Sequence, residues 1–387
     1  MMRRNCPLKI AGIICEYNPF HNGHLRHIQL TREKSGCDRV ICCMGGSFTQ
    51  RGEMAIADKF LRAEMALRCG ADAVIELPAL YCVRTADVFA SAGVQLLTAA
   101  GANILSFGSE ITDISTLRTL AEMRENEPET VSAQIQDGLR SGKSHARARG
   151  EAWSTYMNLD TNRPNSILAV EYIRAVQKFS CDMEPLPIQR LGEYHGENLD
   201  TFASATAIRR AIRSGDEYRH SIPEPVHSLI KNAAISENID NLALYCLRTA
   251  NLKTILGADE GLENRLLEAA LESSTLEEVI EKVKCKRYIR ARITRLIAAS
   301  MLGITFQLAK NHPNPEYIRI LGYRKESKDL LARMAKGPLK FASRASELRG
   351  DEVFELERRA TDLWGLSTKD SFLRKAGRDL TQKLLVL

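Results

Sequence analysis

The feature that most constrains the fold is a regular alternation of apolar, β-branched runs with helical patterns in the first third of the chain. The apolar runs fall at residues 8–15, 39–44, 72–77 and 103–107. Helical patterns lie between them at 24–34, 57–69 and 86–100, and glycine directly follows the last two, as it commonly does at helix ends. Strands about 30 residues apart with helices between them indicate βαβ units and a parallel sheet, which binds ligands at the carboxyl ends of its strands.

The remainder of the chain is predicted to be mostly helical. Residues 112–160 have a polar helical pattern, 185–191 are typical of one more strand, and 204–215 of a helix with a serine cap. The prolines of 221–225 interrupt both kinds of element and mark a boundary. A length of 387 residues suits two or three domains. We predict an α/β catalytic domain at 1–220 and a helical, basic domain at 221–387.

Composition narrows the class of protein. The net charge of +6 permits a nucleic-acid partner without requiring one. No apolar run approaches the roughly 20 residues of a transmembrane helix, and no small-residue cleavage site follows the apolar N-terminal run, so we interpret that run as a strand and not a signal peptide. The ten cysteines include no C-x-x-C pair, which favours buried thiols in a reducing compartment. We expect a cytoplasmic protein that does not bind membranes.

The segment EYNPFHNGHLRHI (16–28) places two histidines around Asn-Gly, directly after the first predicted strand. A catalytic zinc site needs about three protein ligands, and this spacing lacks the glutamate of H-E-x-x-H, so we predict no metal-binding side chains. Plain helix capping explains neither the glycine nor the position after a strand. A phosphate site explains both, because a helix N-terminus offers unpaired N–H groups and Gly23 permits close approach. His21 and His24 are then the predicted catalytic residues, which donate hydrogen bonds to an α-phosphate as charge builds there.

A second phosphate element is predicted in ASATAIR (203–209), where Ser204, Thr206 and Arg209 open the late helix. Alone, this segment is a plain N-cap with a surface arginine. Together with HNGH, contact with phosphate becomes the favoured interpretation. GLRSGKS (138–144), by contrast, is not a P-loop, because Asp137 stands where that motif needs glycine and no strand precedes it.

These motifs resemble, in one order, the tRNA(Met) cytidine acetate ligase family of bacteria, whose H-x-G-H signature is that of the nucleotidyltransferase superfamily. The resemblance covers most of residues 10–210 and extends more weakly to KCKRYIRARITRL and EYIRILGY. It is carried by EYNPFHNGHLRHI, GSFTQRGEMAIADKFLRAEMAL, GADAVIELP, FASAGVQLL, FGSE, RPNSILAVEYIRA and ASATAIR.

The resemblance implies a Rossmann-like nucleotidyltransferase parallel sheet followed by a mainly helical C-terminal domain. It also implies ATP-dependent activation of acetate as acetyl-adenylate, with release of pyrophosphate. The acetyl group then passes to the exocyclic amine of the wobble cytidine of elongator tRNA(Met), which releases AMP. Magnesium is expected with the ATP phosphates.

The family's ATP contacts can be carried over position by position. Ser47, Ser166 and residues 144–148 depart from the family pattern, which leaves the adenylate chemistry intact but bears on the acetate and RNA pockets. The implied ATP-binding residues are Ile14, Cys15, Glu16, Tyr17, Asn18, Pro19, Phe20, His21, Asn22, Gly23, His24, Leu25, Arg26, His27, Gly108, Asn165, Arg190 and Leu191.

A polar cluster after the second strand, Gln50, Arg51, Asp58, Lys59 and Arg62, supports two interpretations. In the structural one, Asp58 caps the next helix while Lys59 and Arg62 form a solvated face. In the functional one, Arg51 or Lys59 holds acetate or pyrophosphate. Both remain open, since charges at the functional edge of a sheet are also often structural.

The stretch KVKCKRYIRARITR (282–295) holds seven basic residues and one tyrosine. It lacks the compensating acids seen elsewhere in the chain, so we interpret it as an RNA-backbone contact and not as a solvated helix face. Weaker candidates are Arg344, Arg349, Arg358 and Arg359, which lie in an acid-balanced region. The predicted tRNA-binding residues are Lys286, Arg287, Arg290, Arg292 and Arg295.

Two other functions compete with the ligase. An adenylyltransferase for a small phosphorylated metabolite would use the same histidines, but it rarely needs about 170 additional residues. A noncatalytic RNA-binding protein would have no use for an intact HNGH with Gly108 and Arg190. The residues alone identify neither the base nor the tRNA, and they leave open the oligomeric state and the base of the transfer step.

Overall fold

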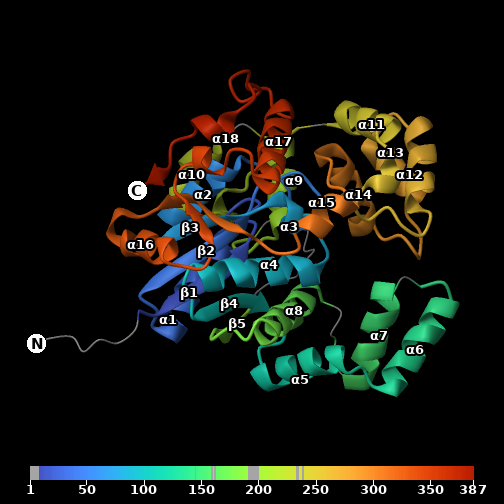
Figure 1. The fold of residues 1–387 in the computed structure, drawn as a ribbon, viewed down its shortest axis with the longest axis horizontal. Helices are drawn as coiled ribbons and strands as arrows, with labels where there is room; N and C mark the ends of the chain where they lie inside the picture. The colour runs from blue at the N-terminus through green and yellow to red at the C-terminus, as the bar shows by residue number, and fades with distance from the viewer. Residues whose placement is uncertain are drawn as a thin grey trace, which may run out of the picture.

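A computed structural model describes residues 8–143, 145–157, 160, 163–190, 200–231, 235–237 and 239–387. Its centre is one sheet in the order β5-β4-β1-β2-β3-β6-β7 (Figure 1). The first five strands are parallel neighbours, which confirms the α/β prediction. They are β1 (Ile10–Cys15), β2 (Arg39–Gly45), β3 (Ala73–Leu77), β4 (Ile104–Ser109) and β5 (Glu184–Gln189).

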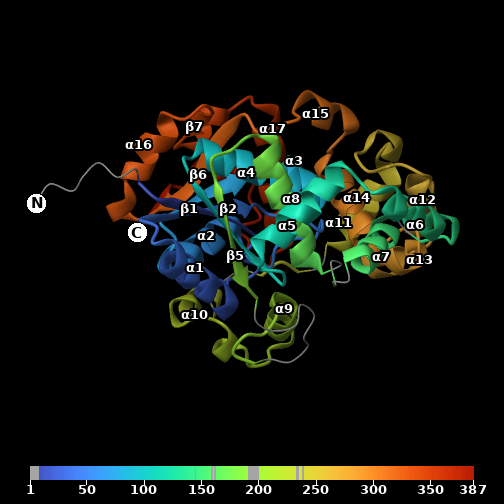
Figure 2. The same ribbon diagram turned by 90° about the horizontal axis from the view of Figure 1, so that it is seen from below.

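Helices cover both faces of the sheet because its strands are apolar on both sides. In β1, Ile10 belongs to one buried core, while Ala11 and Ile13 belong to the core on the opposite face. Figure 2 shows α1, α9 and α10 on one side of the sheet and α4 and α8 on the other. The bounds are α1 (Asn22–Ser35), α2 (Lys59–Arg68), α3 (Ala79–Cys82), α4 (Ala86–Ala99), α8 (Pro164–Lys178), α9 (Ala205–Ser214) and α10 (Glu224–Lys231).

The polar helical region predicted at 112–160 forms three helices. They are α5 (Ile114–Glu125), α6 (Glu129–Arg140) and α7 (His145–Met157). α5 packs against α8, while α6 and α7 pair with each other and stand off from the sheet (Figure 1).

The part after residue 221 is mainly helical, as predicted, but it also supplies strands. Helices α11 to α14 pack against one another as a lobe beside the sheet (Figure 1). No helix in the described residues is long and apolar enough to cross a membrane. The bounds are α11 (Asp240–Thr249), α12 (Leu262–Leu271), α13 (Leu276–Val283), α14 (Arg290–Leu302), α15 (Phe306–Asn311), α16 (Asp329–Ala335), α17 (Glu352–Leu366) and α18 (Arg378–Thr381), with short 3-10 turns at Leu252–Thr254, Lys325–Ser327 and Ala345–Leu348. Another 3-10 turn, Arg219–Ser221, lies directly before this part.

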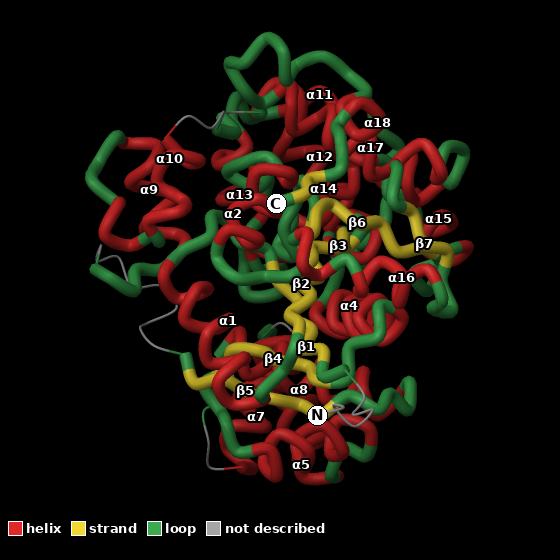
Figure 3. Tube along the Cα trace, turned by 90° about the vertical axis from the view of Figure 1, so that its left-hand side faces the viewer, coloured by secondary structure: helices red, strands yellow, loops and turns green. Residues whose placement is uncertain are grey.

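Three C-terminal strands were missed by the sequence prediction. β6 (Tyr317–Tyr323) pairs antiparallel with β3, and β7 (Lys340–Ala342) and β8 (Leu385–Val386) both pair with β6. Figure 3 shows the strands as one continuous sheet. The domain limits 1–220 and 221–387 remain a prediction. The sheet contains strands from both of these ranges.

A buried group of charges joins the C-terminal segment to the sheet. Lys59 Nζ lies 2.6 Å from Glu76, 3.0 Å from Glu357 and 2.9 Å from Asp379. Arg319, on β6, pairs with Glu76 at 2.9 Å and with Asp379 at 2.5 Å. These five side chains, which we call the ionic cluster, come from α2, β3, β6, α17 and α18 and are almost fully buried. Pairing is what makes such charges tolerable away from water.

Candidate active site

The turn between β1 and α1 is tied to the rest of the carboxyl edge of the sheet. Asn18 Oδ1 accepts a hydrogen bond from the backbone N–H of Ile56 at 2.7 Å. The carbonyl of Asn18 accepts one from the guanidinium of Arg209 at 2.9 Å. Tyr17 has a left-handed backbone (φ 48°), and its hydroxyl lies 3.3 Å from the thiol of Cys42 on β2. The turn that the motif predicted as a ligand loop is therefore held in one conformation from two directions.

The two histidines of HNGH cap helix α1 reciprocally. His21 Nδ1 accepts from the N–H of Gly23 at 3.1 Å, and His24 Nδ1 accepts from the N–H of His21 at 3.2 Å. Their rings stack, with centroids 3.7 Å apart and planes 25° from parallel. The helix thus begins at Asn22, slightly earlier than predicted. Because both Nδ1 atoms accept, both rings are neutral and carry their proton on Nε2.

Burial keeps these imidazoles neutral. It lowers the pKa of His21 to about 3, helped by the charges of Arg190 and Arg209. Burial also lowers the pKa of His24 well below the ordinary value, with His21 and Arg190 adding to the effect. The charges of Arg190 and Arg209 therefore act on His21, and that of Arg190 also acts on His24; phosphate contact by these residues stays a prediction.

Gly23 has a structural reason to be glycine besides access for a ligand. A Cβ atom at this position would lie 2.9 Å from Cε1 of the His21 ring, a contact that real side chains essentially never make. The small residue therefore lets the imidazole of His21 fold back over the first turn of α1. This contact explains why glycine stands between the histidines.

The carboxyl ends of β4 and β5 bring together three more predicted ATP residues. Arg190 donates to Asn165 Oδ1 at 3.2 Å, and a Cβ on Gly108 would lie 3.2 Å from the Arg190 side chain. Glu110 orients this group, because its carboxylate accepts from Asn165 Nδ2 at 2.7 Å and from Ser166 Oγ at 2.8 Å. Sequence reasoning missed Glu110, although it stands inside the quoted FGSE motif.

Other residues of the ATP segment hold α1 in place. Arg26 donates to the carbonyl of Gln189 on β5 at 3.0 Å, and His27 Nε2 lies 3.0 Å from Ser106 Oγ on β4. Burial lowers the pKa of His27 to about 4. Asn22 donates to two backbone carbonyls near α9, at 2.9 and 2.8 Å. These contacts are structural, and ATP contact by the same residues stays a prediction.

The ASATAIR segment forms the predicted N-cap of α9. Ser204 Oγ accepts from the N–H of Ala207 at 3.2 Å, which confirms the cap. Arg209 lies 3.2 Å from Thr206 Oγ1 and 3.8 Å from Glu53, besides its bond to the β1–α1 turn. A phosphate role for these residues remains a prediction.

For the polar cluster predicted after the second strand, the structure supports part of the structural interpretation. Asp58 caps α2 through the N–H groups of Phe60 and Leu61, as one interpretation expected. Neither Lys59 nor Arg62 forms a solvated face, because each is only 1% exposed. Lys59 is also not available to hold acetate or pyrophosphate, since three carboxylates of the ionic cluster surround its ammonium group.

Arg62 has a structural role that its sequence position did not indicate. Its guanidinium donates to the carbonyls of Glu16, Gly45 and Gly46, and its Nε to Ala57. It therefore ties the end of β1 to the end of β2. Burial lowers the pKa of this guanidinium. Its hydrogen bonds to carbonyl groups offset part of the cost of burying the charge.

Several arginines of the basic segment (282–295) form ion pairs with acidic residues outside it. Arg290 pairs with Glu277 at 2.6 Å and approaches Glu281 at 3.6 Å. Arg292 pairs with Asp259 and Glu260, and Arg287 lies 3.5 Å from Glu260. The inference that this segment lacks compensating acids is therefore wrong, because the acids come from α13 and from the loop before α12. RNA contact by the segment stays a prediction.

Leu191 and residue 144 lie outside the described residues. Within the described ranges, no group of three or more His, Cys, Asp or Glu side chains is arranged to hold a metal ion.

Comparisons with known proteins match this chain over nearly its whole length. The HIGH nucleotidyl transferase family model matches residues 8–379. A protein of Thermoanaerobacter sp. (strain X514) named tRNA(Met) cytidine acetate ligase is 36% identical over 98% of this chain and 100% of its own length. A Clostridium perfringens protein of the same name is 34% identical over 92% and 95%.

Solved structures agree with these matches. Thermotoga maritima TmcAL without ligand superposes with a TM-score of 0.91 at 31% identity, and its complex with alpha-thio ATP superposes with a TM-score of 0.89 at 32% identity. Each structure covers 98% of this chain and 100% of the matched chain.

Proposed function

The chain belongs to the tRNA(Met) cytidine acetate ligase family, and from this membership we propose that it activates acetate with ATP and acetylates the wobble cytidine of elongator tRNA(Met). It is an ATP-dependent ligase that forms AMP and pyrophosphate. The competing adenylyltransferase function is disfavoured, because the named relatives are ligases that match the helical second half as well as the nucleotide site.

The observation that carries the proposal is the reciprocal cap of His21 and His24. With both Nδ1 atoms engaged by backbone N–H groups, both Nε2–H groups are donors that need no proton from solvent. They belong to the first turn of α1, where the helix dipole also favours negative charge. Hydrogen bonds from neutral imidazoles stabilise charge on the α-phosphate as an acetate oxygen attacks it and pyrophosphate departs.

Arginines complete the phosphate site. Arg190, directly after β5, and Arg209, on α9, carry charges that act on His21, and they hold the phosphates through planar forks. Magnesium would accompany ATP, because phosphate oxygens and water are the ligands it prefers. It would neutralise charge on the departing pyrophosphate.

The second step is acyl transfer. The exocyclic amine of cytidine is a weak nucleophile, because its lone pair is delocalised into the ring, and free acetate does not acylate it. The mixed anhydride of acetyl-adenylate supplies a good leaving group, since the amine attacks the acetyl carbonyl and AMP departs. The tRNA substrate also leads us to infer that the enzyme works in the cytoplasm.

Exchange of labelled pyrophosphate into ATP tests the first step. We expect exchange to require acetate but no tRNA, and zinc chelators to leave it unchanged. His24→Ala should slow exchange by roughly 100- to 1,000-fold, the effect of one lost donor to a developing anion, with a smaller change in ATP affinity. His145→Ala, at an exposed histidine of α7, is the matched control. Exchange that ignores acetate but needs a phosphorylated metabolite would establish the adenylyltransferase instead.

A further inference from the structure

The turn after β4 is held by its own backbone and by the end of β5. The N–H of Arg190, directly after β5, donates to the carbonyl of Ser109 at 3.2 Å. Ser109 is fully buried, and its Oγ accepts from the N–H of Ile111 at 3.1 Å. Glu110, which lies between Ser109 and Ile111, therefore extends from a fixed backbone.

Both carboxylate oxygens of Glu110 accept hydrogen bonds from the first turn of α8. Oε1 accepts from Asn165 Nδ2 at 2.7 Å, and Oε2 accepts from Ser166 Oγ at 2.8 Å. Ser166 is only 1% exposed, and a buried hydroxyl is costly without a partner. Glu110 is thus held against α8 at two points.

These bonds fix the orientation of the Asn165 amide. An ionised carboxylate can only accept hydrogen bonds, so the amide nitrogen of Asn165 must face Glu110 and the amide oxygen must face away from it. That oxygen accepts from the guanidinium of Arg190 at 3.2 Å. If the amide turned over, its NH2 group would face a guanidinium, which has no acceptor. The carboxylate of Glu110 therefore decides, through Asn165, which amide atom faces Arg190.

Arg190 reaches Asn165 by crossing the end of β4. A Cβ on Gly108 would lie 3.2 Å from Arg190 Cγ and 3.5 Å from its Cδ, so the aliphatic part of the arginine lies over the backbone of Gly108. The charge at the end of this side chain acts on His21 and His24. Asn165 thus contacts the part of Arg190 on which its proposed role with phosphate depends.

We propose that Glu110 is a positioning residue for ATP binding, because it sets the amide of Asn165 and thereby holds the guanidinium of Arg190 in place to bind the phosphates. The inference rests on the proposed function and adds to it a residue that acts on ATP through two others. The competing interpretation is that Glu110 only fastens α8 to β4. The two interpretations differ in what happens when the hydrogen bond between Glu110 and Asn165 is reversed.

Glu110→Gln tests the proposal in the full-length protein. The new amide can accept from Ser166 but turns its own NH2 group to Asn165, so Asn165 must turn over and present its NH2 group to Arg190. We expect ATP affinity, measured by calorimetric titration with ATP, to fall about 10- to 100-fold, the range for a hydrogen bond to a charged group. Glu122→Gln, at an exposed position of α5, is the matched control for the loss of charge, and it should bind ATP like the parent.

The double variant Glu110→Gln/Asn165→Asp separates positioning from general structure. It keeps the net charge of the parent and reverses one hydrogen bond, because the new amide donates to the new carboxylate. The other oxygen of that carboxylate can again accept from Arg190. We expect the double variant to restore most of the ATP affinity and of the acetate-dependent pyrophosphate exchange that Glu110→Gln alone loses. When Arg190 is replaced by alanine, Glu110→Gln should cause little further loss, because residues that act through one another are not additive.

Three results would overturn the proposal. Equal ATP affinity of Glu110→Gln and Glu122→Gln would show that the amide orientation does not matter. A double variant that binds ATP no better than Glu110→Gln would show that Glu110 only fastens α8 to β4. The same loss with and without Arg190 would show that Glu110 acts on ATP by another route.

The test also holds if Glu110→Gln does not fold, which urea unfolding would reveal. The double variant then decides, because the proposal requires it to fold and to bind ATP like the parent. Failure of the proposed function would look different, since the parent protein itself would then bind no ATP or would exchange pyrophosphate without acetate.

Discussion

At the scale of single residues, the histidine pair is unusual because its caps fix its protonation. Each Nδ1 accepts a backbone N–H, so protonation of either ring would break a cap as well as bury a charge. Lowered pKa values mean that the folded protein takes up these protons only well below the pH at which the unfolded chain does. Activity should therefore not be lost through histidine protonation as the pH falls from 8 to 6.

Stability, unlike histidine-dependent activity, should decrease as the solution becomes acidic. Since the pKa of His21 is about 3 in the folded protein against 6.5 ordinarily, the unfolded chain binds more protons between these values. The free energy of unfolding must then decrease as the pH falls through that window. His21→Asn, which can cap without titrating, should lose less stability than the parent between pH 7 and 4.5 in urea unfolding. The exposed His145→Asn should behave like the parent, and an equal loss in all three proteins would contradict the assignment.

Sequence motifs pointed to residues that the structure brings together, but not to the partners that hold them in place. HNGH, Gly108 and Arg190 stand at the carboxyl ends of β1, β4 and β5, and Asn165 lies in the first turn of α8. Glu110 was missed, because a carboxylate that orients an amide has no spacing rule of its own. Lys59 was misjudged for a related reason, since a charge buried among carboxylates distant in sequence looks the same in one dimension as a charge at the surface.

At the scale of secondary-structure elements, the ionic cluster fastens α17 and α18 to the sheet. Lys59 faces three carboxylates, and Glu357 also accepts from the N–H of Ala79 at 2.7 Å. Burial and the nearby Glu76 raise the pKa of Glu357 to about 7, against the opposing effect of Lys59. Lys59 is therefore the cation that favours the charged form of Glu357 within the cluster.

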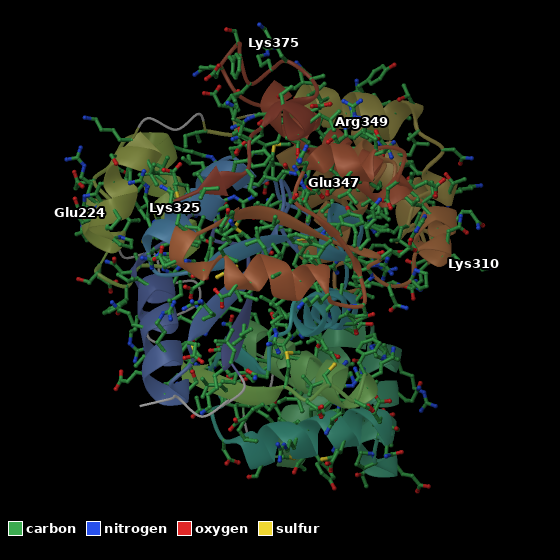
Figure 4. All side chains as sticks on the ribbon, turned by 60° about the vertical axis from the view of Figure 1, so that its left-hand side comes forward. Glu224, Lys310, Lys325, Glu347, Arg349 and Lys375 are labelled. Carbon is green, nitrogen blue, oxygen red and sulfur yellow. The ribbon has the colours of Figure 1, made fainter. Side chains whose placement is uncertain are left out.

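Lys59→Met should lower the free energy of unfolding by about 3–5 kcal/mol, because it leaves the buried Glu357 without its cation and leaves Glu76 and Asp379 with Arg319 alone. Lys325→Met is the control, since Lys325 is exposed and lies at the surface in Figure 4. Denaturant unfolding of both variants measures the difference. A loss below about 1 kcal/mol for Lys59→Met would show that water or a proton compensates the cluster.

Elements of the first part were predictable because each strand is a continuous apolar run followed by an amphipathic helix. β6 was not predicted because Arg319 interrupts its apolar run. Ion pairs with Glu76 and Asp379 allow that arginine to be buried. β7 and β8 are too short to leave a pattern. Such segments become strands because they pair with a strand that is distant in sequence, and no local sequence pattern records that pairing.

At the scale of the whole molecule, the chain returns to its own sheet after building the helical lobe. β6 pairs with β3 in the sheet. The basic segment and α14 therefore lie, along the chain, between two strands of the same sheet, β5 and β6. The turn at 48–54 touches α14 from the other direction. An RNA bound along α14 would thereby be held at a fixed distance from the nucleotide turn, which acyl transfer between two large substrates requires.

The most direct measurement follows labelled acetate into RNA. The protein is incubated with ATP, acetate and either elongator tRNA(Met) or another tRNA, and the labelled nucleoside is identified by mass spectrometry while AMP is counted. We predict one AMP for each acetyl group, with label on the wobble cytidine of elongator tRNA(Met) and almost none with His24→Ala. Consumption of ATP with acetate that leaves the RNA unlabelled, or label carried by a small metabolite, would contradict the assignment.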